Sequence, residues 1–224
     1  GIAVLRVDDR SIGKSTGDFA QATSEDFASD VLAGVEYLKG RKEIGPKKIG
    51  LIGHSEGGVI APMVAVQSSD VAFIILMAGT GLTGEEVCYL QAALINRAEG
   101  ASDEAIAKNL SLQEQLFTVL KEERDDAVAE KKLRTIYEDT ISELELSEKE
   151  KEIAEANVEA EIKQILSPWF RYFLTYDPSP TLMKVKCPIL AINGEKDLQV
   201  PPKENLPAIE AALKAGGNNN YTIK

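Results

Sequence analysis

The sequence is poor in the residues that build metal sites and disulfide frameworks. It contains two cysteines, Cys88 and Cys187, and one histidine, His54, among 224 residues. Two distant cysteines give neither a disulfide framework nor a C-x-x-C metal pattern, and we expect both to be buried as small hydrophobic residues. A single histidine excludes a histidine-rich metal site, so the sequence implies no metal.

The chain also lacks a long hydrophobic run and an excess of basic residues. Its longest apolar stretch, residues 71–78, has the length of a strand, whereas a membrane-spanning helix needs about 20 residues. Lys and Arg number 25 against 36 Asp and Glu, which argues against a nucleic-acid surface or an anionic membrane surface. Residues 81–166 hold 21 acidic and 10 basic residues, and the remainder holds 15 of each. The middle of the chain is therefore a separate compositional segment.

Hydrophobic residues make up 44% of the chain, which is enough to form a core. Continuous apolar runs predict buried strands, and these are residues 1–7, 48–52, 71–77, 187–193 and 221–224. Between them lie helical patterns that begin near Thr23, after Gly58 and at residue 203. Alternating strands and helices predict a doubly wound, mostly parallel α/β sheet with helices on its faces.

The acidic middle segment has a different pattern. It is predicted to be helical from Glu85 to Leu166, with helix starts at Ser102 and Ser147. We therefore predict a sheet core made of residues 1–80 and 181–224, with a helical insertion at 81–180. Five aromatic residues lie near the end of the insertion: Trp169, Phe170, Tyr172, Phe173 and Tyr176. They are expected to pack the insertion onto the core; the alternative is that they line an acyl or aromatic substrate pocket.

Residues 53–57, Gly-His-Ser-Glu-Gly, match the pattern G-x-S-x-G between a predicted strand and a predicted helix. In that position Ser55 would be a nucleophile on a sharp, strained turn, and glycines at 53, 57 and 58 would leave room for it. The backbone N–H of Glu56 would then bind a developing oxyanion at the start of the helix. The alternative is a chance Gly-Ser loop before a helix, but the flanking strand and helix favour the nucleophile.

With these residues the sequence resembles the α/β-hydrolase family, and more narrowly its lysophospholipase- and serine-aminopeptidase-like branch. Residues 9–15 are similar to the family loop D-x-R-G-x-G-x-S, with Ser11 where the family usually has glycine. Residues 193–197 resemble the strand-end segment that bears the acid of the catalytic triad, which places Asp197 in the acid's position. The helical insertion falls where this family commonly carries a lid.

The position of Asp197 also supports a functional role independently of the resemblance, because it follows a predicted parallel strand at the edge where open α/β sheets bind ligands. The alternative is an ordinary turn aspartate after Gly194. His54 is interpreted as a structural residue packed behind the turn, since consecutive residues there point apart and the family's base follows the acid. The resemblance therefore implies that the chain is a fragment, with its catalytic histidine after Lys224 and its first strands and second oxyanion donor missing.

The sequence predicts a serine hydrolase that cleaves carboxylic esters through a Ser-Asp-His triad and an acyl-enzyme, without a cofactor. Its expected partner is a small-molecule ester or amide, with no nucleic acid and no membrane span. The alternatives are an aminopeptidase or amidase of the same fold, whose acidic insertion could hold an ammonium group, and a non-catalytic binding protein.

Overall fold

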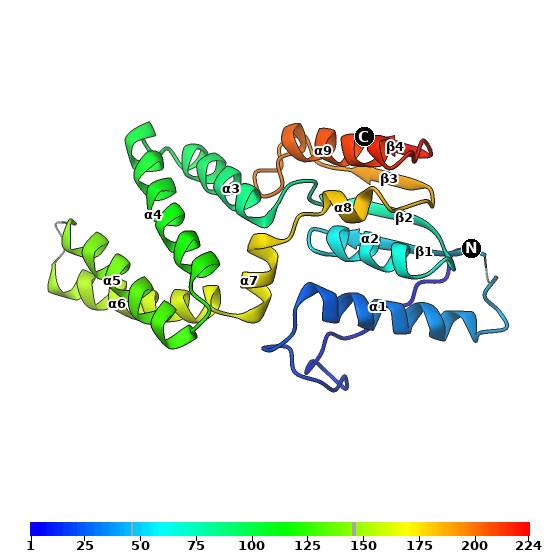
Figure 1. Ribbon diagram of the computed structural model, residues 1–224, viewed down its shortest axis with the longest axis horizontal. Helices are drawn as coiled ribbons and strands as arrows, with labels where there is room; N and C mark the ends of the chain where they lie inside the picture. Colours follow the sequence, from blue (N-terminus) through cyan, green and yellow to red (C-terminus); the bar gives the residue numbers. More distant parts are fainter. Residues whose placement is uncertain (46, 145–146) are drawn as a thin grey trace.

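Four parallel strands form the centre of the fold in the computed structural model, which describes residues 1–45, 47–144 and 147–224 (Figure 1). The strands are β1 (Ile49–His54), β2 (Val71–Met77), β3 (Ile189–Ile192) and β4 (Tyr221–Ile223). Their order in the sheet is β1-β2-β3-β4, and every neighbouring pair is parallel. Helices connect successive strands, as parallel crossovers require. The predicted parallel α/β architecture is confirmed.

The two faces of the sheet differ in burial. On one face Ile74, Leu76 and Ala191 are fully buried, and the register places Gly53 and Leu76 side by side. On the other face Ile52 is 65% exposed, and Phe73 and Met77 are also exposed. Since side chains alternate across a strand, this difference shows which face the described helices cover.

The buried face packs against helices, three of which the sequence pattern predicts and one of which, at residues 179–182, it does not. These are α1 (Ser24–Lys39), α2 (Gly57–Gln67), α8 (Ser179–Leu182) and α9 (Pro202–Ala215), whose apolar side chains share one core with the strands. The predicted start at Thr23 is confirmed, because its backbone N–H donates to Asp26 Oδ2 at 2.9 Å in a capping box. The helix ends at Gly40, as its sequence predicts.

The predicted strand at residues 1–7 is wrong. This segment has no strand pairing, and its apolar side chains are exposed, with Ile2 at 95% and Val4 at 75%. An extended segment becomes a strand only when a neighbouring strand pairs with its backbone groups, and no described strand lies beside this one. The apolar pattern therefore indicates a preference for extended structure, but it does not show whether a neighbouring strand is present.

The insertion is helical, but it is broken into separate helices. They are α3 (Gly84–Ala98), α4 (Asp103–Glu122), α5 (Asp126–Ser142), α6 (Glu148–Ile165) and α7 (Pro168–Thr175). The helix caps predicted at Ser102 and Ser147 are confirmed. Residues of α4, α5, α6 and α7 form a hydrophobic cluster of their own, which supports the predicted boundaries at 81 and 180, although those boundaries stay a prediction.

The insertion leaves the sheet at its carboxyl end. Helix α7 lies beside α1 and α3, whereas α4, α5 and α6 extend away from the sheet (Figure 1). Asn205, which is fully buried in α9, accepts a hydrogen bond from the Gly81 N–H at 3.0 Å and so ties the first residue of the insertion to the core. Within the described ranges, no helix combines the length and the apolar character needed to cross a membrane.

Candidate active site

Ser55 lies on the turn between β1 and α2 in a strained conformation. Its φ is 54°, in the left-handed region that non-glycine residues rarely adopt. The Ser55 N–H donates to the Met77 carbonyl at 2.9 Å, and the Gly58 N–H donates to the Ser55 carbonyl at 2.8 Å. The backbone is therefore held from both sides in the sharp strand-to-helix turn that a G-x-S-x-G nucleophile requires.

Two glycines allow this turn to form. A Cβ atom at Gly53 would lie 1.8 Å from the Gly57 carbonyl oxygen, and one at Gly58 would lie 2.5 Å from the Cα of Gly79. Both distances are far below van der Waals contact, and the obstructing atoms are backbone. The prediction that position 57 needs a glycine to leave room is wrong. A Cβ atom there would meet no atom within 4 Å, so the position faces open space.

Glu56 is the residue that caps α2, with helical angles of φ −53° and ψ −36°. Its N–H stands at the beginning of the helix, where N–H groups have no acceptor within the helix and the helix dipole favours negative charge. The Glu56 side chain points to other elements: its Oε1 accepts hydrogen bonds from Ser24 Oγ and Trp169 Nε1, both at 2.7 Å. The sequence pattern gives this carboxylate no role, because its two partners come from distant segments.

Asp197 lies in the loop after β3, half-buried. Its Oδ1 accepts hydrogen bonds from the N–H groups of Gln199 at 2.9 Å and Val200 at 3.0 Å. Ser55 follows β1, and Asp197 lies in the loop that follows β3. Strand β2 lies between these two strands, so their axes are about 10 Å apart. Among the described residues no hydrogen bond joins these two side chains.

His54 is exposed, so the interpretation of a residue packed behind the turn is wrong. It pairs with Met77 and belongs to the face of the sheet that the described helices do not cover. Gly53, one residue earlier, is buried on the opposite face, because side chains alternate along a strand. Within the described part of the chain, no hydrogen bond connects His54 with Ser55.

The loop of residues 9–15 keeps its turn despite Ser11. Ser11 has a φ of 62°, a conformation that glycine adopts more easily. Its Oγ donates to the Gly17 carbonyl at 2.7 Å, which stabilises the turn. Arg10 anchors the loop to α1 through Asp30, with Nε and Oδ2 2.7 Å apart. Ser11 therefore adopts a conformation typical of glycine, and its side chain hydrogen-bonds within the loop.

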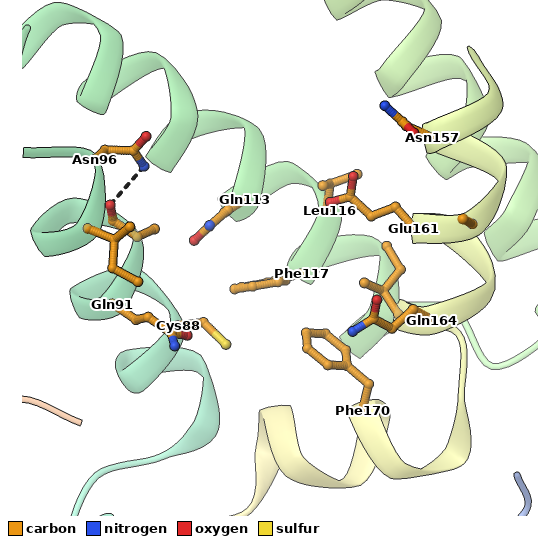
Figure 2. Close-up of a pocket in the computed structure, with 14 residues that line it drawn as sticks. Cys88, Gln91, Asn96, Gln113, Leu116, Phe117, Asn157, Glu161, Gln164 and Phe170 are labelled. Carbon is orange, nitrogen blue, oxygen red and sulfur yellow. Dashed lines mark hydrogen bonds between the residues drawn. The ribbon is translucent and has the colours of Figure 1, made fainter. Parts of the chain in front are cut away.

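A cavity of about 570 Å³ lies inside the insertion, between α3, α4, α6 and α7 (Figure 2). Cys88, Gln113 and Phe117 face it, and neither Ser55 nor Asp197 lines it. Burial raises the pKa of Cys88 to about 11, so its thiol is protonated at neutral pH and is a poor nucleophile. In the described ranges, no group of three or more His, Cys, Asp or Glu side chains could hold a metal ion.

The aromatic residues of α7 contact one another and both parts of the molecule. Trp169 stacks on Phe173, with ring centroids 5.4 Å apart, and Tyr172 stacks on Tyr176 at the same distance. Phe170 belongs to the insertion's hydrophobic cluster and also lines the cavity. The expected packing of insertion onto core is thus confirmed, since Tyr172 and Tyr176 pack against the sheet core.

Comparisons with known proteins agree with this fold. The model of the X-Pro dipeptidyl-peptidase (S15) family matches residues 1–218. An esterase from Pyrococcus furiosus has a similar structure, with a TM-score of 0.54 and 15% identity, over 95% of this chain and 56% of its own length. A bromoperoxidase from Bacillus anthracis gives a TM-score of 0.50 and 16% identity, over 97% of this chain and 70% of its own.

The two structural likenesses show the fold, and the chain spans only about half the length of that esterase. A search of curated proteins finds no match. The match to the S15 family covers nearly all of the chain, and the predicted α/β-hydrolase resemblance is confirmed. The chain belongs to the X-Pro dipeptidyl-peptidase (S15) family, whose members are hydrolases of the α/β fold.

Proposed function

We propose that the complete enzyme is a serine hydrolase in which Ser55 is the nucleophile and Asp197 is the acid of the triad. The observation that carries this proposal is the left-handed φ of 54° at Ser55, held by backbone hydrogen bonds and by the close approach of Gly58 to Gly79. A protein that only binds ligands gains nothing from a strained serine at this point. The base would be a histidine that is not among these 224 residues.

The reaction follows from this arrangement. The histidine takes the proton of Ser55 Oγ as that oxygen attacks the substrate carbonyl, and Asp197 stabilises the imidazolium that forms. The N–H of Glu56 donates to the carbonyl oxygen, which becomes an oxyanion. The histidine then gives its proton to the leaving group, and the acyl-enzyme remains on Ser55 until water, activated by the same base, releases the acid.

Carboxylic esters are the first proposed substrate class, because an alkoxide leaves a tetrahedral intermediate more easily than an unprotonated amide nitrogen does. Peptides or amides are the second class, and the match to a dipeptidyl-peptidase family supports them. The acidic insertion, with 21 acidic residues between 81 and 166, is also suited to a substrate that carries an ammonium group.

The test labels one sample of the complete enzyme with a fluorophosphonate probe, and on a separate, unlabelled sample it compares short p-nitrophenyl esters with aminoacyl and X-Pro p-nitroanilides. We expect the probe to label Ser55 and ester turnover to exceed amide turnover. Amide turnover with a higher kcat/KM would replace the ester assignment with the peptidase one. A protein that neither reacts with the probe nor turns over any of these substrates is a binding protein, and the proposal would be wrong.

Asp197→Asn in the complete enzyme is expected to lower kcat by roughly ten-thousand-fold, because an amide cannot stabilise the imidazolium or hold it in the correct tautomer. The fold should be retained, since the asparagine oxygen can still accept from Gln199 and Val200. Glu195→Gln, an exposed change in the same loop, is the matched control. Equal, small losses in both variants, measured as kcat on an ester, would contradict the triad role of Asp197.

A further inference from the structure

We propose that the Glu56 carboxylate is a positioning residue that couples the insertion to the oxyanion turn. The proposal rests on the proposed function, because it concerns the same residue whose N–H would bind the oxyanion. One residue thus carries two groups with different tasks. Its N–H faces the reacting carbonyl, and its side chain holds that N–H in place through contacts with α1 and α7.

The contacts of Glu56 join three separate elements. Its Oε1 accepts from Ser24 Oγ, in the first turn of α1, and from Trp169 Nε1, in the first turn of α7, at 2.7 Å each. These partners lie 32 and 113 residues away in the sequence. Hydrogen bonds to a carboxylate are stronger than those between neutral groups. Ser24 is only 2% exposed, so water cannot readily replace it as a donor.

Trp169 is itself fixed by its surroundings. Its ring stacks on Phe173 at 5.4 Å with an interplanar angle of 5° and contacts Phe170 at 6.2 Å. Ser167 caps α7 by accepting from the Phe170 N–H at 3.2 Å, and Pro168 starts the helix. The indole N–H therefore points in one direction, and a partly buried indole N–H needs an acceptor. Glu56 is that acceptor.

The geometry has a consequence for catalysis. When α7 is docked, two donors hold the Glu56 side chain, and the start of α2 is fixed against α1. When α7 moves away, Glu56 loses one donor, and its N–H is less well placed for the oxyanion. Misplacement of a catalytic donor by about 1 Å can cost up to a hundred-fold in rate. The insertion would in this way assist the transition state and leave ground-state binding nearly unchanged.

If the hydrogen bond between Trp169 and Glu56 only stabilises the fold, its removal should change the stability and not kcat. In that case the aromatic stacking and the cluster around Phe170 hold α7, and the hydrogen bond to Glu56 adds only stability. The two explanations separate in Trp169→Phe, which keeps a stacked ring but removes the N–H donor. Tyr172→Phe is the matched control, because it removes another hydrogen bond between α7 and α1, from Tyr172 O–H to Glu25 Oε1 at 3.2 Å, without touching Glu56.

The experiment measures kcat, KM and the melting temperature of the complete enzyme and its variants on one ester. We expect Trp169→Phe to lower kcat by roughly ten-fold with KM unchanged, less than the hundred- to thousand-fold loss that follows removal of a whole oxyanion donor. Glu56→Leu should show a similar or larger loss, and Glu56→Gln, which keeps an accepting oxygen, should recover most of it. The double variant Glu56→Leu/Trp169→Phe should be no worse than Glu56→Leu alone, because both changes remove one interaction.

Equal kcat values in Trp169→Phe, Tyr172→Phe and the unchanged enzyme would overturn the proposal, even if the melting temperature of Trp169→Phe fell. Additive losses in the double variant would overturn it as well. Failure of the proposed function looks different: the unchanged enzyme would then not react with a fluorophosphonate, and its turnover would not depend on Ser55. That outcome would overturn both proposals together.

Discussion

Ser55→Ala in the complete enzyme is expected to lower kcat by on the order of a million-fold, because the members of a triad act as a unit. In the proposed mechanism this hydroxyl forms the acyl-enzyme. Its neighbours Gly53, Gly57 and Gly58 have no side chain to replace it, and the Glu56 carboxylate is bound to Ser24 and Trp169. The measurement is kcat on an ester together with fluorophosphonate labelling. The residual rate should be that of the oxyanion site alone.

His54→Ala is the control for this experiment. It removes the neighbouring side chain, which is exposed on the other face of the sheet, so kcat should change little. Substitutions at such exposed positions typically change the free energy of unfolding by less than about 0.5 kcal/mol. Losses of similar size in Ser55→Ala and His54→Ala would contradict the roles assigned to the two residues.

The strands and helices could be predicted because their signals are local. The run Val71–Met77 is apolar throughout and forms β2 with these bounds, and the capping box at Thr23 begins α1. The position of Ser55 was likewise predictable, since G-x-S-x-G between a strand and a helix has few other uses. Local patterns thus predicted the parallel sheet and the turn that carries the proposed nucleophile.

The wrong predictions concern residues whose structure depends on a neighbour that is distant in the sequence. Residues 1–7 have a strand pattern but no described strand beside them, and His54 is exposed because the described helices cover only the opposite face. At Gly57 a side chain would have room, because this position of the turn faces open space. The Glu56 carboxylate could not be assigned from sequence, because Ser24 and Trp169 come from distant segments.

The 224 residues by themselves are expected to show no measurable ester hydrolysis. Their single histidine, His54, lies on the face of the sheet away from α2 and has no hydrogen bond to Ser55 within the described ranges. Without a base the Ser55 hydroxyl keeps a very high pKa and is a weak nucleophile at neutral pH. The same residues offer one proposed oxyanion donor, the Glu56 N–H, and lack of a second such donor typically costs roughly a hundred- to a thousand-fold.

The test compares the 224-residue chain with a longer form of the protein that supplies a further histidine, each also as Ser55→Ala. The longer form should hydrolyse p-nitrophenyl esters and lose that activity in Ser55→Ala, whereas the 224-residue chain should match its own Ser55→Ala variant. Ester turnover by the shorter chain that disappears in Ser55→Ala would show that a residue among these 224, and not a further histidine, activates Ser55. The triad proposed for this site would then be wrong at its base, although Ser55 would remain the nucleophile.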